Sequence, residues 1–272
     1  MTEIKALASG SEVKITFLVD NSEGPGCGAE HGLSLLIEGD IRLLFDAGQS
    51  DLFLKNAASL SLDLSGVDLA VLSHGHYDHG DGFEHFPGFR LVCHPECFTR
   101  RFREKNGTYI GLKYDRQSAE ELFTLDMTAH PLKLSNTMTF LGHIPRLNNF
   151  EAKQTTFFLE DGQQDFVSDD SALVIETSKG LIVIAGCSHS GICNIVEYAR
   201  KVTGISRVVA VMGGFHLKEG SPAIKNTVDY LKLLDPELLM PCHCVDTSVI
   251  QYLHTVFPCQ SVFAGKVLVF PA

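Results

Sequence analysis

The residues best suited to chemistry form one short run, SHGHYDHG, at positions 73–80. Neutral imidazole and carboxylate groups are good ligands for zinc, with iron or manganese as the alternatives. In this spacing His74 and His76 can bind one ion. Asp78 and His79, in the turn that follows, can bind a second. Two such divalent ions about 3.5–4 Å apart hold a bridging hydroxide and clamp both oxygens of a displacement, so the run predicts a dinuclear site.

Histidines also follow the ends of three other predicted strands, each near a predicted helix. They are His189 after strand 181–185, His216 after strand 208–212 and His243 after strand 238–240. The run at 73–80 follows a fourth predicted strand, 67–72. Strands that alternate with helices predict an α/β layered domain. Because ligands bind beyond the carboxyl ends of the strands in such domains, we expect these histidines to converge on the run.

Composition narrows the classes of protein that could carry this site. The chain has 272 residues, 44% of them hydrophobic, which suits one large domain. No apolar run is long enough for a membrane span, and the start, MTEIKALASGSEVK, lacks a secretory pattern. Eight cysteines without a signal peptide indicate reduced thiols and a cytoplasmic location. A formal net charge of −11 argues against nucleic acid as a partner.

The middle of the chain, from about 98 to 165, is more polar than the rest. It contains a basic cluster, Arg100, Arg101, Arg103 and Lys105, and the segment GHIPRLNNFE. Its apolar content is thin for a separate core. We therefore expect a single domain over 1–272, with a lid or insertion at about 98–165.

SHGHYDHG, preceded by LLFDAG, resembles the metallo-β-lactamase superfamily. The resemblance implies an αββα sandwich, two mixed sheets flanked by helices, with a two-metal site on its rim. Asp46 matches an early aspartate that supports the site by hydrogen bonding. Further stretches resemble the dihydropterin-ribofuranosylaminobenzene phosphate synthase-like branch, and they are AEHGLSLLIE, HIPR, DDSALVIETSKGLIVIAGCSHSGI, MGGFHL and PCHC. This resemblance runs from about Val13 to Val269 and is weakest from 98 to 140.

The chain departs from the superfamily pattern at several ligand positions. Cys187 stands where many members have a bridging aspartate, and it is either a ligand or a packing residue. Asp170 falls near the usual third histidine and is a candidate replacement, although His189 is the preferred ligand. His243 matches the last histidine of the pattern. His216 is additional, and we interpret it as substrate-facing or a general acid, with metal ligation or support of a ligand as the alternatives.

Substrate clues are few and point to an anion. Ser188 and Ser190 lie at a predicted helix start, where free backbone N–H groups favour negative charge. Arg146 and the basic cluster could contact phosphate, and His31 could line the same rim. These residues predict a small, anionic or phosphorylated substrate.

The leading interpretation is a metal-dependent hydrolase that uses a hydroxide held at the dinuclear site to attack an ester- or phosphoester-like centre. Asp78 and His216 are its predicted catalytic residues. The branch resemblance implies an alternative, a synthase joining an aminobenzoate to a phosphoribosyl donor. A nuclease and a metal-dependent sensor without catalysis rank below both.

Overall fold

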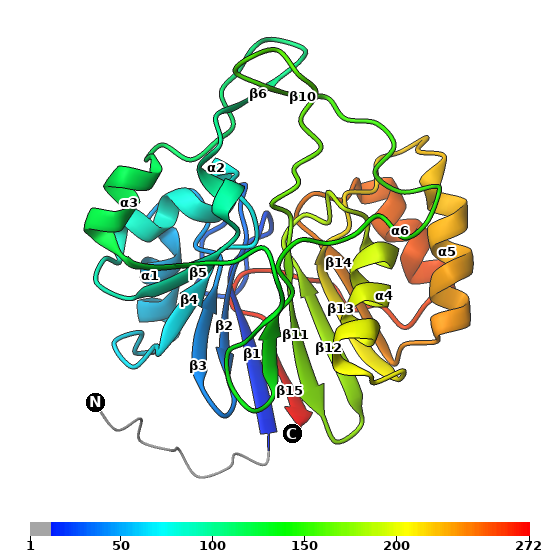
Figure 1. Cartoon of the computed structure of the whole chain (residues 1–272). Coiled ribbons are helices and arrows are strands. Elements are labelled where there is room, and N and C mark those ends of the chain that lie inside the picture. The colour runs from blue at the N-terminus through cyan, green and yellow to red at the C-terminus, as the bar shows by residue number, and fades with distance from the viewer. Residues whose placement is uncertain (1–11) are drawn as a thin grey trace.

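Two β-sheets pack face to face at the centre of the protein, and helices cover their outer faces (Figure 1). The structure is a computed structural model that describes residues 12–272. The first eleven residues, which carry most of the segment judged for a secretory signal, lie outside this range. The arrangement is the αββα sandwich that the sequence predicts, so the expected fold class is confirmed.

The first sheet has seven strands and takes most of them from the first half of the chain. Its spatial order is β15 (Val267–Pro271), β1 (Glu12–Val19), β2 (Ser34–Glu38), β3 (Arg42–Phe45), β4 (Leu69–Val71), β5 (Arg90–Cys93) and β7 (Thr124–Met127). The strands from β3 to β7 are parallel, and the other pairs are antiparallel. Its outer face is covered mainly by α1 (Leu52–Ser59), α3 (Arg116–Leu122) and two 3-10 helices, Asp81–His85 and Pro95–Phe98.

The second sheet has six strands and comes from the second half of the chain. Its order is β14 (Leu238–Cys242), β13 (Val208–Gly214), β12 (Gly180–Ala185), β11 (Ala172–Thr177), β9 (Met138–Phe140) and β8 (Leu132–Lys133). β12, β13 and β14 run parallel, so their carboxyl ends meet at one edge. Helices α4 (Ile192–Thr203), α5 (Ala223–Leu234) and α6 (Thr247–Val256) cover its outer face.

The strands are apolar on both faces because both faces are buried. In β2, Leu35 and Ile37 enter the core between the sheets, whereas Leu36 packs under the helices of the first layer. In β12, Ile182 and Ile184 face the other sheet, and Val183 packs under the second layer of helices. Successive side chains of a strand alternate between faces, so a doubly covered strand reads as a continuous apolar run.

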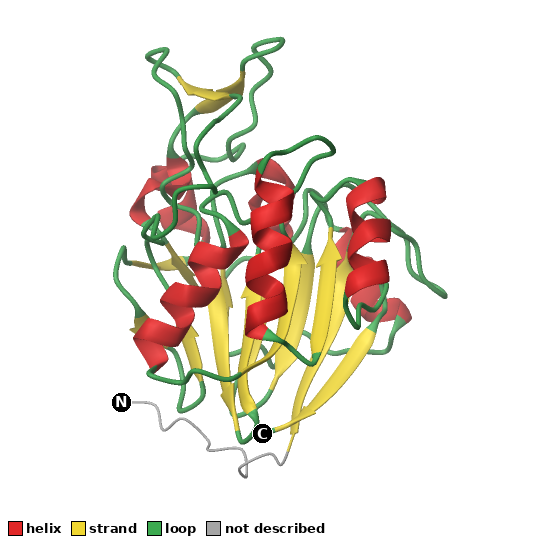
Figure 2. Ribbon diagram, turned by 90° about the vertical axis from the view of Figure 1, so that its right-hand side faces the viewer, coloured by secondary structure: helices red, strands yellow, loops and turns green. Residues whose placement is uncertain are grey.

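The segment predicted as a lid is divided between the sheets and a projection above them. β7, β8 and β9 join the edges of the two sheets. Within residues 12–272, β6 (Arg101–Arg103) and β10 (Phe157–Leu159) are the strands that pair outside the two large sheets, as a two-stranded ribbon at the top of the molecule (Figures 1 and 2). The range predicted for a lid or insertion, 98–165, thus contains both the ribbon and three strands of the two sheets. β7 and β8 bury few side chains, and β9 has only three residues, which is why apolar content alone did not reveal these strands.

The ribbon carries part of the basic cluster, and one of its arginines is not available to solvent. The Arg101 side chain is buried and ion-paired, with 3.2 Å to Asp165 and 2.8 Å to Asp169. Its cost of burial is offset by these carboxylates.

Across residues 12–272, none of the helices combines the length and the apolar composition that crossing a membrane requires.

Candidate metal centre

The run SHGHYDHG forms the turn that leaves β4 and enters the short helix α2 (Tyr77–Gly80). His74 and His76 are buried, and their Nε2 and Nδ1 atoms lie 3.0 Å apart. The ring of His189, which follows β12, lies 4.8 Å from each of theirs. The structure therefore brings together the three histidines expected around a first ion.

A second set of donors lies on the other side of the same turn. His79 Nε2 is 3.0 Å from Nε2 of His243, which follows β14. An Asp78 carboxylate oxygen is 3.4 Å from that His243 nitrogen. Cys187 Sγ is 3.2 Å from His79 Nε2, and it also groups with His74 and His189. Cys187 thus lies between the two sets of donors.

Hydrogen bonds at the far nitrogen of each ring orient the second set. His79 Nδ1 lies 2.7 Å from Asp46 Oδ2, and His243 Nδ1 lies 3.1 Å from Asn21 Oδ1. Asp46 also accepts hydrogen bonds from the backbone N–H and hydroxyl of Ser73, so its carboxylate is fixed. Because these oxygens only accept, both Nδ1 atoms carry protons and both Nε2 atoms are left to bind a cation.

The donor geometry fits a divalent ion. Two nitrogens bound to one zinc ion at about 2.0–2.1 Å lie roughly 3.3 Å apart in a tetrahedral site. The nitrogen pair of His79 and His243 is close to that spacing. The Nε2 atom of His189 is buried, and no described residue hydrogen-bonds it. Buried polar atoms rarely lack a partner, so this nitrogen, grouped with His74 and Cys187, fits the coordination of a cation.

Burial sets the charges of the first set. Burial, followed by repulsion from the neighbouring imidazoles, holds the pKa of His74 and of His189 well below its usual value. His76 follows the same pattern, with burial as the largest cause and repulsion from His189 next. All three rings are therefore neutral near pH 7, as metal ligation requires.

In the second set, Asp78 and His79 are charged instead. Burial would raise the pKa of Asp78, but hydrogen bonds from His243 and His31 bring it well below its usual value. Burial would lower the pKa of His79, but the Asp46 carboxylate raises it to about 9. A proton therefore occupies the His79 position in the metal-free chain, and an ion that binds there must displace it.

Backbone strain is concentrated at this edge of the sheets. Asp46, Ser188, His216 and His243 all have positive φ, at 55°, 57°, 48° and 54°. Such left-handed conformations cost roughly 1–3 kcal/mol each in residues other than glycine. Each of the four lies one to three residues beyond a strand end, where the strain turns a side chain towards the donors.

Comparisons with known proteins agree with this geometry, although no family model matches the chain. An uncharacterized protein of Methanocaldococcus jannaschii is 37% identical over 266 residues, which covers 93% of this chain and 99% of that protein. The 7,8-dihydropterin-6-methyl-4-(beta-D-ribofuranosyl)-aminobenzene-5'-phosphate synthase of the same organism is 31% identical, covering 89% of this chain and 90% of its own.

A solved structure gives the decisive likeness. The crystal structure of Tm1679, a metal-dependent hydrolase of the beta-lactamase superfamily, matches with a TM-score of 0.86 at 31% identity, covering 96% of this chain and 100% of that one. The chain belongs to the metallo-β-lactamase superfamily. The family resemblance of the sequence is confirmed, and with it the coarser expectation of an enzyme with a metal cofactor.

The structure places Asp170, the candidate replacement for the usual third histidine, beside the loop of His189 and outside the donor groups among residues 12–272. Asp170 is buried and accepts a hydrogen bond from the Ser190 backbone N–H at 2.8 Å. Burial raises the pKa of Asp170 to about 6. Its neighbour Asp169 accepts from the Gly75 backbone N–H at 2.7 Å. The two carboxylates therefore hold the loops of His189 and of His74–His76.

The start of α4 is not the free anion site that the sequence suggested. Glu151 accepts hydrogen bonds there from the backbone N–H groups of Cys193 and Asn194, each at 3.0 Å. The Ser188 hydroxyl donates to the Gly214 carbonyl. Ser190 is buried and does not line the cavity beside the donors. The protein's own carboxylate thus takes the position expected for a substrate.

A cavity of about 1060 Å³ opens beside the donors. Asp78, His189 and His216 line it, and so does His31, whose Nε2 is 3.0 Å from Asp78 Oδ2. Arg146 does not line it, because its guanidinium donates to the carbonyls of Ile144 and Phe166. Arg103, Lys153 and Lys218 line it instead.

Several residues of the site were missed by sequence reasoning. They are Asn21, Glu151, Asp169 and Cys244. Only Cys244 carried a signal, because it adjoins His243 in the segment PCHC. The other three act through hydrogen bonds across 42 or more positions of the chain, which no local pattern encodes.

Proposed function

We propose that this chain is a metal-dependent hydrolase of small, anionic esters or phosphoesters. The observation that carries the proposal is the opening of a large cavity directly onto two sets of buried metal donors. A neighbour with 31% identity, Tm1679, is described as a metal-dependent hydrolase, which supports the reaction class.

His74, His76 and His189 would hold one ion, and Asp78, His79 and His243 a second, with Cys187 between them. Divalent ions, when bound, supply Lewis acidity and an activated water at neutral pH. His31 hydrogen-bonds Asp78 at the cavity wall and keeps that carboxylate ionised and oriented. Phe157 packs edge-on against His76 and His189, so it shields these ligands from bulk water.

The charge of the cavity wall favours an anionic substrate. Arg103 comes from β6 of the ribbon, and Lys153 comes from the loop before β10. No carboxylate of the described residues is within ion-pair distance of either side chain, whereas Lys218 pairs with Asp246 at 3.2 Å. Cations without a fixed partner lower the free energy of a bound phosphate or carboxylate.

A synthase is the second candidate, because the synthase of M. jannaschii is 31% identical over most of both chains. The product in that name carries a dihydropterin-6-methyl group on a ribofuranosylaminobenzene phosphate. The alternative expected from the sequence is a related reaction, which would join an aminobenzoate to a phosphoribosyl donor with release of carbon dioxide and pyrophosphate. It needs the same clamp on anionic oxygens, so the geometry alone does not separate the two reactions.

The test is a substrate screen with metal-loaded protein. One arm offers phosphodiesters, phosphomonoesters, lactones and thioesters, and the other offers an aminobenzoate with a phosphoribosyl donor. Hydrolysis that disappears in His74→Ala supports the hydrolase, while release of carbon dioxide and pyrophosphate only in the second arm supports the synthase. Absence of turnover in both arms, with the ions bound, contradicts both. Arg103→Gln and Lys153→Gln should raise KM for the anionic substrate only, leaving neutral lactones unchanged.

A further inference from the structure

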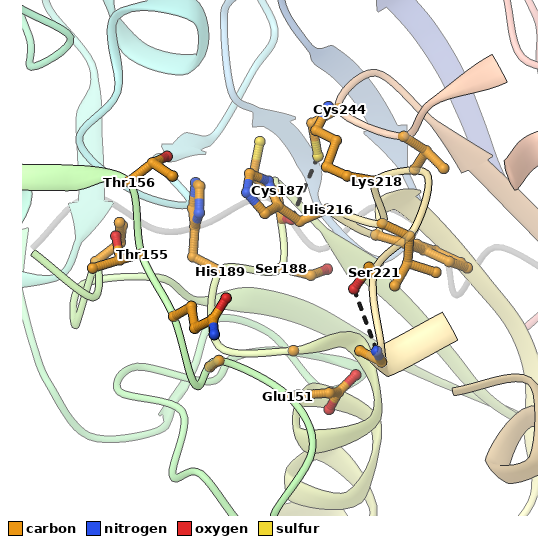
Figure 3. Close-up of a pocket in the computed structure, with 18 of the residues that line it drawn as sticks. Glu151, Thr155, Thr156, Cys187, Ser188, His189, His216, Lys218, Ser221 and Cys244 are labelled. Atoms are coloured by element: carbon orange, nitrogen blue, oxygen red, sulfur yellow. Dashed lines mark hydrogen bonds between the residues drawn. The ribbon is translucent and has the colours of Figure 1, made fainter. Parts of the chain in front are cut away.

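Three side chains beside the two donor sets form a cluster of their own. Cys187, His216 and Cys244 follow the carboxyl ends of β12, β13 and β14. Their donor atoms all lie within 4.8 Å of one another. Figure 3 shows the two sulfur atoms and the imidazole gathered at one end of the cavity. Neither Cys244 nor His216 belongs to the two sets already described.

The backbone is shaped to bring these donors together. A Cβ on Gly214 would lie 2.5 Å from Cys244 Sγ and 3.1 Å from the Cys187 Cα, so any larger residue would force the loops apart. His216 adopts a left-handed backbone, with φ of 48°. Its Nδ1 is buried, and no described residue hydrogen-bonds it. A buried imidazole nitrogen that has no hydrogen-bond partner and lies beside two sulfur atoms is available to bind a cation.

The chemistry of the set selects the ligand. Zinc and other soft or borderline cations prefer thiolate and imidazole ligands such as these. Magnesium and similar ions prefer oxygen ligands instead. Cys187 Sγ lies 3.2 Å from His79 Nε2, so its sulfur can serve the neighbouring donor set as well. Thiolate sulfur has more than one lone pair and can bridge two ions.

We propose that Cys187, His216 and Cys244 bind a further zinc-type divalent cation, with the Cys187 thiolate shared with the adjoining site. Three protein donors leave a fourth position open towards the cavity that all three residues line. This takes the metal-ligand alternative for His216 in place of the proton-donor role favoured by the sequence. The assignment does not depend on which reaction the enzyme catalyses.

The test is titration of the full-length, reduced protein with cadmium, monitored by bound metal after gel filtration and by the ultraviolet charge-transfer absorption of cadmium–thiolate bonds. We expect three ions per chain in the wild type and two in Cys244→Ser, with about half of the absorption lost because one of two ligating thiolates is gone. Cys259→Ser, which removes a half-buried thiol outside the cluster, should change neither quantity.

His216→Gln provides a second variant should Cys244→Ser fold poorly, and it should lose the same single ion while keeping both thiols. A thiol count of eight in denatured wild type and His216→Gln, and of seven in Cys244→Ser, excludes a disulfide as the cause of a lost ion. Saturation of the wild type at two ions overturns the proposal, and so does an absorption unchanged by Cys244→Ser. Wild-type protein that binds three ions but hydrolyses none of the substrates would contradict the proposed function and would still support this metal site.

Discussion

The two sheets supply the metal centre in different ways. The first sheet contributes His74, His76, Asp78 and His79 from a single turn after β4. The second contributes donors from three separate loops, after β12, β13 and β14, whose spacing depends on the parallel register that pairs Ala185 with Gly213 and Gly214 with Cys242. We call the donors of the turn after β4 the local half of the site and the donors after β12, β13 and β14 the dispersed half. Local chain geometry fixes the local half, and the packing of the whole second sheet fixes the dispersed half.

The two halves also differ in their support. Asp46, a buried anion, fixes the His79 ring, whereas the neutral amide of Asn21 fixes His243. On the second sheet the sulfur atoms of Cys187 and Cys244 add soft donors that the first sheet lacks. The local turn thus carries imidazoles and a carboxylate, and tertiary packing adds further imidazoles and the thiols.

Removing a donor from the local half should have the largest effect. Asp78→Ala should release the ion shared with His79 and His243 and leave the ion of His74, His76 and His189 in place. We expect kcat to fall by about 10²–10³, the usual scale for losing stabilisation of developing charge. Metal analysis and steady-state kinetics check this, with the half-exposed His85→Ala as the control. Equal loss of both ions would mean that the two halves do not bind separately.

Widening the dispersed half is the complementary change. In Gly214→Ala the new methyl would lie 2.5 Å from both Cys244 Sγ and the Gly186 carbonyl oxygen. Overpacking of this kind costs about 1–3 kcal/mol of stability, and the loops should lose affinity for metal as they separate. Denaturant unfolding and metal titration measure the two effects. Gly28→Ala, whose methyl would meet only the flexible end of Leu52 at 3.2 Å, should be close to wild type.

Neutralising Asp46 should weaken the local half less. Asp46→Asn should lower metal affinity about 10–100-fold, as is usual for a partner that orients a ligand. Because Asp46 raises the pKa of His79 to about 9, wild-type protein should release a proton on metal binding below that pH, and its affinity should increase as the pH rises towards 9. Asp46→Asn should lose this dependence near pH 7.

Calorimetry in buffers of different ionisation enthalpy counts the protons released. Asn21→Ala removes the neutral partner of His243 and should have the smaller effect of the two. An equal loss in both variants would show that charge is not what distinguishes the halves.

The smallest effect should come from a change at the start of α4, the helix that follows the His189 loop. Glu151→Gln keeps the shape of the group that caps α4 but removes its charge. We expect a loss of about 1 kcal/mol in the free energy of unfolding, since an anion at a helix start contributes about that much. Thermal unfolding at two salt concentrations measures it. Glu160→Gln, at an exposed site, is the control, and an identical change there would remove the capping role.

The local half of the site could be predicted from sequence because its four donors lie within six residues of one turn. Strands buried on both faces appear in the sequence as continuous apolar runs, so they could be predicted. The histidines that follow these runs indicated that the donors meet at one edge of the sheets. The strands β7, β8 and β9 were not found, because β7 and β8 bury few side chains and β9, although buried, has only three residues.

The sequence by itself determined the candidate metal-binding turn at 73–80, since the spacing of side chains within a turn is set by the covalent chain. Only the tertiary structure decided that Asp170 supports a loop, that Glu151 fills the start of α4, and that Cys244 joins Cys187 and His216. These contacts join segments 20 to 57 positions apart, and their distances follow from how strands and loops pack. Packing across the whole core fixes such distances, and no short stretch of residue types records them.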